Sequence, residues 1–128
     1  MDRVLSLMTT ARDKFQTRIT GSVAASTTDQ QLSAIVPNNE KWHLGRVVFA
    51  HANDNRNISG GFQLEWGDAV GGWTFITGCY LTGATFNDKI DQTFTGNGVK
   101  RFRLTRQNLD TVAKTMSVVI DGFKRIGD

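Results

Sequence analysis

Residues with the chemistry for metal binding are scarce in this sequence and poorly spaced. The two histidines, His43 and His51, are eight positions apart, which separates them by roughly 26 Å along a regular strand. One metal ion cannot bridge that distance, because metal–ligand bonds are only about 2 Å long. The spacings His-x-His, His-x-x-x-His and Cys-x-x-Cys are absent. We therefore predict no metal site and no cofactor, with both histidines at the surface or at loop ends.

Motifs for nucleophilic or carboxylate catalysis are also lacking. The Gly-x-Ser-x-Gly turn that exposes a catalytic serine does not occur, and neither does a glycine-rich loop for nucleotide phosphates. Cys79 lies on an apolar strand face, where a thiol is usually an inert packing residue. Glu65 with Asp68 or Asp91 could form the acid pair of a glycoside hydrolase, but Glu65 is expected on the solvent face of its strand. We predict that the chain is not an enzyme.

The charged residues favour an acidic partner. Fifteen lysines and arginines outnumber twelve aspartates and glutamates, for a net charge of +3. A basic cluster follows residues 96–98 and comprises Lys100, Arg101, Arg103 and Arg106. Because Phe102 and Leu104 point inward in a strand, Arg101 and Arg103 share the outward face. The cluster is either a solvated strand face or a contact for an acidic protein surface, and the charge excess is too small to favour nucleic acid.

The large aromatic residues divide between a predicted core and one exposed position. Trp42, Trp66 and Trp73 fall where the strand patterns place buried side chains. Tyr80 has the opposite parity to Trp73 and Phe75 in the same predicted strand, so we expect it to point outward and to lie at an interface. An exposed aromatic ring could instead stack on sugars, as in a carbohydrate-binding module.

The first sixteen residues differ from the rest of the chain. They contain no glycine and carry apolar residues at spacings of three and four, which is the pattern of one face of a short helix. A helix of this length is marginal alone in water. We therefore expect residues 1–16 to form an N-terminal arm that docks on a neighbouring subunit, or else packs on its own sheet or frays. The predicted contact residues of the arm are Val4, Leu7, Met8 and Phe15.

From residue 17 onward the apolar pattern changes to the period of two that is typical of β-strands. The composition agrees, because threonine and glycine are abundant while glutamate is rare. The third predicted strand has apolar residues of both parities, which indicates either burial on both faces or a bulge near Gly45. We predict about eight strands, at residues 17–26, 31–36, 41–53, 62–66, 73–81, 89–95, 100–109 and 116–123.

Turn signals separate these strands. The sequence Pro37-Asn38-Asn39 ends one strand, and Gly71-Gly72 forms a turn between two others. The pair Asn97-Gly98 lies between two strand patterns, which predicts a hairpin. Residues 17–128 are therefore expected to form one all-β domain, an antiparallel β-sandwich of jelly-roll type.

No apolar run in the sequence is long enough for a membrane span, and the single cysteine cannot form an internal disulfide.

Two segments resemble small β-sandwich virion proteins of tailed bacteriophages. One strand ends in Val36-Pro37, and a short polar turn leads to a strand that begins Trp42-His43-Leu44. Those proteins carry Val-Pro-Ala-Gly at this point, followed by a charged residue and a hydrophobic strand, whereas Asn38-Asn39 stands here in place of Ala-Gly. Residues 119–125 resemble the closing strand of the same proteins. The likeness extends in pattern over residues 17–126.

The resemblance implies a non-enzymatic capsid decoration, or cement, protein that stabilises the shell through subunit contacts. Such proteins often form trimers, so the expected partners are the major capsid protein, other virion proteins and further copies of this chain. The expected location is the capsid surface of the virion after synthesis in the host cytoplasm, without a membrane or nucleic acid. The contacts predicted from this sequence are the four arm residues with Arg101, Arg103, Arg106 and Tyr80.

Three other functions stay open at the level of the sequence. A tail, neck or fibre-attachment protein of the same particle fits the same features. A carbohydrate-binding module would expose Trp73 or Tyr80. A small β-fold hydrolase would need a deep pocket that holds Glu65 and a second carboxylate, and the absence of a sharp motif makes it the least favoured.

Overall fold

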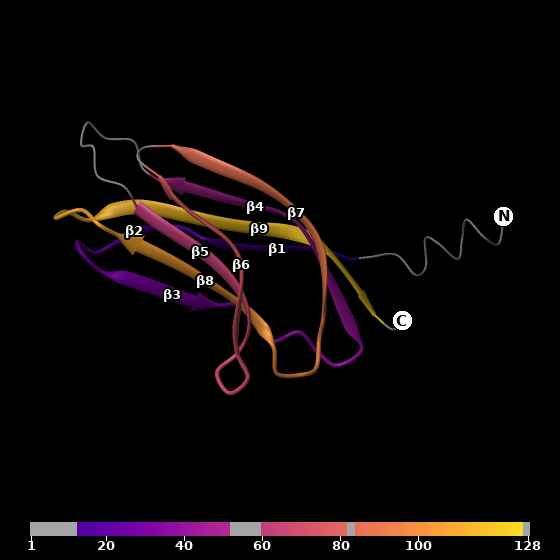
Figure 1. The fold of residues 1–128 in the computed structure, drawn as a ribbon. Coiled ribbons are helices and arrows are strands. Elements are labelled where there is room, and N and C mark those ends of the chain that lie inside the picture. The colour runs from indigo at the N-terminus through magenta and orange to yellow at the C-terminus, as the bar shows by residue number, and fades with distance from the viewer. Residues whose placement is uncertain (1–12, 52–59, 82–83, 127–128) are drawn as a thin grey trace.

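The structure, a computed structural model, describes residues 13–51, 60–81 and 84–126 (Figure 1). These residues form strands, turns and irregular segments, with no helix among them, which confirms the all-β prediction. The strands are β1 (Asp13–Ile19), β2 (Ser22–Val23), β3 (Thr28–Leu32), β4 (Glu40–His51), β5 (Gly60–Asp68), β6 (Gly72–Leu81), β7 (Thr85–Thr95), β8 (Arg101–Asn108) and β9 (Lys114–Ile126).

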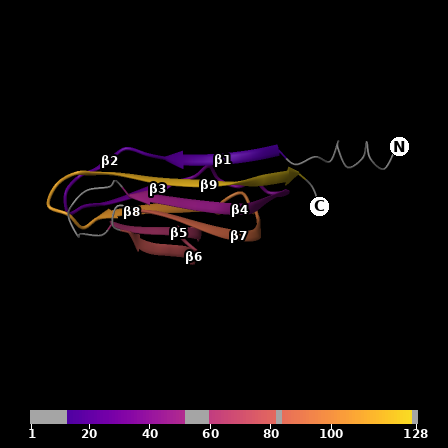
Figure 2. The ribbon, with the colours of Figure 1, turned by 90° about the horizontal axis from the view of Figure 1, so that it is seen from above.

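The strands form two antiparallel sheets with jelly-roll connectivity. One sheet has the order β1-β9-β4-β7, with the short β2 beside β9, and the other has the order β3-β8-β5-β6. The pairs are nested along the chain: β1 pairs with β9, β3 with β8, β4 with β7 and β5 with β6. This nesting results when one long antiparallel hairpin folds over into a sandwich. In Figure 2, β1 and β9 lie along one side of the molecule and β5 and β6 along the opposite side.

The core lies between the two sheets and is rich in aromatic side chains. The ring centroids of Trp42 on β4 and Phe102 on β8 are 6.2 Å apart, and those of Phe49 on β4 and Phe62 on β5 are 5.1 Å apart. Each large apolar side chain that is fully buried contributes roughly 1.5–3 kcal/mol relative to its exposed state. These contacts across the layers hold the two sheets together.

The N-terminal boundary of the sandwich differs from the prediction. Strand β1 begins at Asp13, so residues 13–16, which the helical pattern assigned to the arm, belong to the five-stranded sheet. Phe15 pairs with Gly122 in register, and its ring lies 4.8 Å from that of Trp42. The prediction of a helix up to residue 16 was wrong because Phe15, Thr17 and Ile19 continue the period of two of a β-strand. Val4, Leu7 and Met8 lie outside the described residues.

The segment around Asn97-Gly98 is a connection between sheets and not the predicted hairpin. Strand β7 before it belongs to one sheet and β8 after it to the other. The Asn97 side-chain oxygen accepts hydrogen bonds from the backbone amides of Val99 and Lys100, at 3.0 and 2.9 Å. Gly98 has a φ of 82°, which a glycine adopts at little cost. The prediction of a turn at Asn97-Gly98 is therefore confirmed, but a turn alone does not determine whether the strands on either side of it pair.

The bulge in β4 lies at the predicted position. Its register against both β7 and β9 shifts between Leu44 and Arg46, which keeps Leu44 and Val47 on the same inward face. Gly122 of β9 lies opposite the bulge, where a Cβ would collide with the carbonyl oxygen of His43. Strand β3 is displaced from the predicted 31–36 to Thr28–Leu32, because residues 33–36 run irregularly, with one backbone hydrogen bond from Ser33 to Phe102 of β8 and one from Val36 to Lys100 just before it.

Candidate binding surfaces

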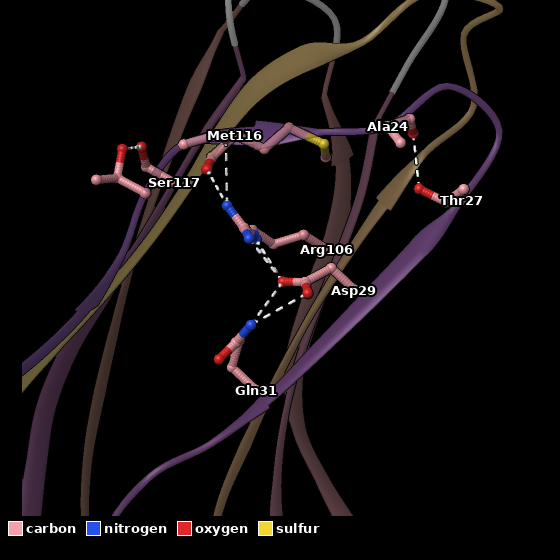
Figure 3. A network of polar contacts seen from close by, with 9 residues as sticks. Ala24, Thr27, Asp29, Gln31, Arg106, Met116 and Ser117 are labelled. Atoms are coloured by element: carbon pink, nitrogen blue, oxygen red, sulfur yellow. Dashed lines mark hydrogen bonds and ion pairs between the residues drawn. The ribbon is translucent and has the colours of Figure 1, made fainter.

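Arg106 is a structural residue and not the surface contact predicted from the basic cluster. It shares parity with the inward-facing Leu104 and is only 5% exposed. Its guanidinium donates hydrogen bonds to Asp29 at 2.6 and 3.1 Å and to the backbone oxygen of Met116 at 2.7 Å (Figure 3). A buried arginine satisfied in this way ties β3, β8 and β9 together and is not free to meet a partner.

The rest of the predicted basic cluster does not form one exposed patch. Arg103 forms an ion pair of 2.8 Å with Glu65 on β5, and its guanidinium lies 4.4 Å from the ring centroid of Trp73 on β6. Arg101 is half-buried. A strand alternates its faces and its neighbours supply counter-charges, so four basic residues close in sequence do not produce one electropositive patch.

The electropositive surface lies instead on the outer face of the five-stranded sheet, which we term the basic face. Its cations come from β1, β4, β7 and β9, and they alternate along each strand with the inward-facing core residues. They form no ion pair with any described residue. The outward carboxylates on this sheet are Asp91 and Asp121. The cations of the basic face are Lys14, Arg18, Lys41, Arg46, Lys89 and Arg125.

No local cluster in the sequence reveals the basic face, because its residues are brought together by pairing between distant strands. Lys41 is the register partner of Arg125, and Arg46 is the register partner of Lys89. The signal available beforehand was local parity alone: each cation alternates with the buried residues nearest to it in its strand, on its own side of the bulge in β4. Reading that signal across strands requires the sheet order, which the sequence pattern does not provide.

His43 lies on the basic face, between Lys41 and Arg46 of β4. Its Nε2 is 2.6 Å from a carboxylate oxygen of Asp91, and its Nδ1 is 2.9 Å from the hydroxyl of Thr93. These three residues, with Lys41 and Arg125, surround a shallow depression of about 360 Å³. Because both ring nitrogens are engaged within the protein, the imidazole has no free nitrogen with which to act as a general base on a substrate.

A second feature, on the outer face of the four-stranded sheet, is the aromatic groove. It holds about 320 Å³ and is lined by Gly61, Phe62, Gln63, Phe75, Gly78, Cys79, Tyr80, Thr105 and Gln107. Tyr80 is 70% exposed, in agreement with its predicted outward direction. Phe75 was expected inside, but it is 57% exposed because the register of β5 and β6 shifts between Leu64 and Glu65. That irregularity changes the parity of β6.

Other chemistry is limited among the described residues. Burial raises the pKa of the Cys79 thiol, and the negative charge of Asp88 raises it further. No group of three or more histidine, cysteine, aspartate or glutamate residues is placed to hold a metal ion in the part of the chain that the structure describes. Over the same residues, the structure contains no helix with the length and apolar character needed to cross a membrane.

Comparisons with known proteins identify a fold but no family. No protein-family model and no curated protein matches this sequence. The Yersinia pseudotuberculosis-derived mitogen is similar in structure, with a TM-score of 0.50 and 14% identity over 91% of this chain and 89% of the mitogen chain. PirA is similar with a TM-score of 0.51 and 13% identity, over 83% of this chain and 92% of PirA.

A chain of the infectious bursal disease virus Gt strain matches at a TM-score of 0.32 and 8% identity, over 91% of this chain and 42% of the viral chain. At such low identities, the likeness to the mitogen and to PirA bears on the fold alone. This chain is a jelly-roll β-sandwich that shares its architecture with these two proteins.

Proposed function

We propose that this chain is a non-enzymatic structural protein of a phage virion, of the capsid decoration type, and that it attaches to the shell through its basic face. The observation that carries the proposal is the concentration on that face of cations that have no ion pair within the described part of the chain. The resemblance of residues 36–47 and 119–125 to phage virion proteins supplies the type of particle. The jelly roll, an architecture common in viral capsids, suits this role, although a fold alone does not specify a function.

The charge distribution favours attachment to an acidic surface. The six cations of the basic face exceed its two carboxylates by four charges, which is more than the net charge of +3 of the whole chain. The remaining surface is therefore close to neutral. An uneven distribution of this kind orients a small protein as it approaches an oppositely charged partner and accelerates their association. The partner proposed here is an acidic patch formed where subunits of the major capsid protein meet.

The shape of the molecule fits attachment better than catalysis. The outer face of the five-stranded sheet carries only shallow depressions, whereas a hydrolase would enclose its substrate between two carboxylates. Glu65, the glutamate that such an enzyme would need, is 9% exposed and is bound to Arg103. Flat β-sheet faces instead match the broad contacts of subunit assembly. Trimer formation on the shell is part of the proposal and follows from the resemblance.

The first test measures attachment to shells assembled from the major capsid protein. The double variant Arg18→Glu/Arg46→Glu should bind more weakly by roughly tenfold or more at low salt, because it reverses two exposed charges of the basic face. The matched control is Lys100→Glu/Arg101→Glu, which reverses two charges on the opposite side of the sandwich and should bind like the original chain. Equal effects of the two variants, or no effect of either, would contradict the proposal.

The second test counts copies of the chain in purified particles by mass spectrometry. A ratio to the major capsid protein near one, or a simple fraction of it, supports shell decoration, because icosahedral symmetry repeats the attachment site. Roughly a dozen copies would place the chain in a tail or neck ring instead. Tight binding of the chain to duplex DNA, lost in the Arg18→Glu/Arg46→Glu variant, would assign the basic face to a phosphate backbone and overturn the attachment proposal.

A further inference from the structure

The aromatic groove has a regular construction on the outer face of the four-stranded sheet. Its floor is a row of register partners that crosses three strands, with Gly78 on β6, Gln63 on β5 and Thr105 on β8. Tyr80 borders one side of this row and Phe75 the other. Their register partners Gly61 and Glu65 are four residues apart on β5, so the backbone positions of Tyr80 and Phe75 are separated by roughly 13 Å along the strand direction. The ring of Phe75 extends back over Gly78, which brings it closer to Tyr80.

The two rings rest on glycines. A Cβ placed on Gly61 would lie 3.0 Å from the Cε1 atom of Tyr80, and a Cβ on Gly78 would lie 3.1 Å from the Cε1 atom of Phe75. Both distances are shorter than ordinary contacts, so any larger residue would push the rings away from the sheet. With glycine at both positions, each ring lies against the backbone and still remains more than half exposed. Each ring therefore presents a broad surface to solvent.

Three polar side chains that line the groove have no hydrogen-bond partner among the described residues. The side-chain amides of Gln63 and Gln107 make no hydrogen bond with any described residue. The hydroxyl of Thr105, a residue that is only 7% exposed, is buried and also lacks a hydrogen-bond partner within the described part of the chain. A buried hydroxyl in this state is unfavourable, and it would gain from a ligand that offers it a hydrogen bond.

No charged residue lines the groove. Arg103, a cation on this face, is paired with Glu65, and its guanidinium lies over the ring of Trp73. The groove therefore offers two aromatic surfaces, amide donors and acceptors, and no counter-charge. A nucleic acid or an acidic glycan would find nothing to neutralise its charge here, and a purely apolar partner would leave the amides and the hydroxyl unsatisfied.

We propose that the aromatic groove binds a short neutral saccharide. One pyranose ring stacks on Tyr80 and another on Phe75, where their C–H surfaces contact the aromatic rings. The hydroxyl groups between them hydrogen-bond to the amides of Gln63 and Gln107, and one that enters between these side chains reaches Thr105. Because the groove lies on the sheet opposite the basic face, a chain attached through that face keeps the groove exposed. The saccharide proposal itself does not depend on the attachment proposal.

The experiment is binding of the purified, fluorescently labelled full chain to an array of neutral oligosaccharides printed beside sulfated and sialylated ones. We expect binding to a subset of the neutral saccharides. Titration with the best of them should show that Tyr80→Ala and Phe75→Ala each weaken binding at least tenfold, whereas Tyr80→Phe, which retains the stacking ring, changes it less than threefold. Val70→Ala is the matched control, because Val70 is 97% exposed but lies outside the groove.

Three outcomes would overturn the proposal. One is that no neutral saccharide binds. Another is that the bound saccharide binds equally well to Tyr80→Ala, with thermal melting used to check that the variant is folded. The third is that Tyr80→Ala instead dissociates an oligomer in sedimentation, which would assign the groove to contact between copies of the chain. Attachment to shells should be unchanged in Tyr80→Ala, so failure of the saccharide proposal and failure of the attachment proposal are distinguishable.

Discussion

At the scale of single residues, the side chains predicted to contact a partner have different roles in the structure. Tyr80 is exposed as expected, whereas Arg106 is buried and Arg103 is paired with Glu65. Parity within β8 would have separated Arg106 from Arg101 and Arg103, because Arg106 alternates in phase with Phe102 and Leu104. The sequence could not show that Asp29 of β3 forms an ion pair with Arg106, since the two residues are 77 positions apart.

Arg106→Ala should lower the free energy of unfolding by about 3 kcal/mol, because it leaves Asp29 without its ion pair and removes one hydrogen-bond donor from each of two backbone oxygens. The backbone oxygens are those of Gly21 and Met116. Arg101→Ala, a change at a half-buried residue of the same strand with no such contacts, should cost less than about 0.5 kcal/mol. Urea denaturation followed by circular dichroism measures both, and similar losses would show that Arg106 does not stabilise the fold in this way.

Cys79 should react slowly in the folded chain. Burial raises the pKa of its thiol above the ordinary value of 9.0, and Asp88 raises it further, so the reactive thiolate is scarcer than in the unfolded chain. Alkylation by iodoacetamide at pH 8, followed by mass spectrometry, should be slower without urea than with it. Because the folded state retains the proton more tightly, the free energy of unfolding should fall as pH rises above about 9.0. Equal alkylation rates would contradict this.

At the scale of elements, strand existence was predictable and strand partnership was not. The period of two located most strands, and mixed parity located the bulge at Gly45, because both are local consequences of burying one face of a strand. The hairpin predicted at Asn97-Gly98 failed, since β7 and β8 pair in different sheets. Only one of the two aromatic residues of the groove could be predicted to be exposed. Tyr80 follows the alternation of its strand, whereas the irregularity in β6 turns Phe75 outward.

Strand β1 also supports a prediction about truncation. Removing residues 1–16 deletes Phe15 and the first part of the ladder between β1 and β9, whereas removing residues 1–12 leaves β1 whole. The chain 17–128 should therefore be less stable than the chain 13–128 by about 2 kcal/mol or more, from the lost contact of Phe15 with Trp42 and the lost hydrogen bonds. Differential scanning calorimetry of the two truncated chains measures the difference, and equal melting temperatures would show that residues 13–16 add nothing to the sandwich.

At the scale of the whole molecule, the two outer faces have opposite character. The basic face concentrates charge and has only shallow relief, while the opposite face carries a neutral aromatic groove between two exposed rings. The jelly roll produces this division, because each strand contributes one row of side chains to the core and the other row to a single outer face. A chain with this arrangement can hold a surface on one side and display a binding groove on the other.

The division predicts two different responses to salt in one protein. Attachment to shells through the basic face should weaken steadily as sodium chloride rises from 0.05 to about 0.5 M, because the Debye length falls below about 5 Å and exposed charges no longer attract each other across the interface. Saccharide binding in the groove should change little over the same range, because no charged residue lines it. Parallel titrations at each salt concentration measure both. If both interactions weakened together, the same charged surface would be responsible for both, and the assignment of one ligand to each face would be wrong.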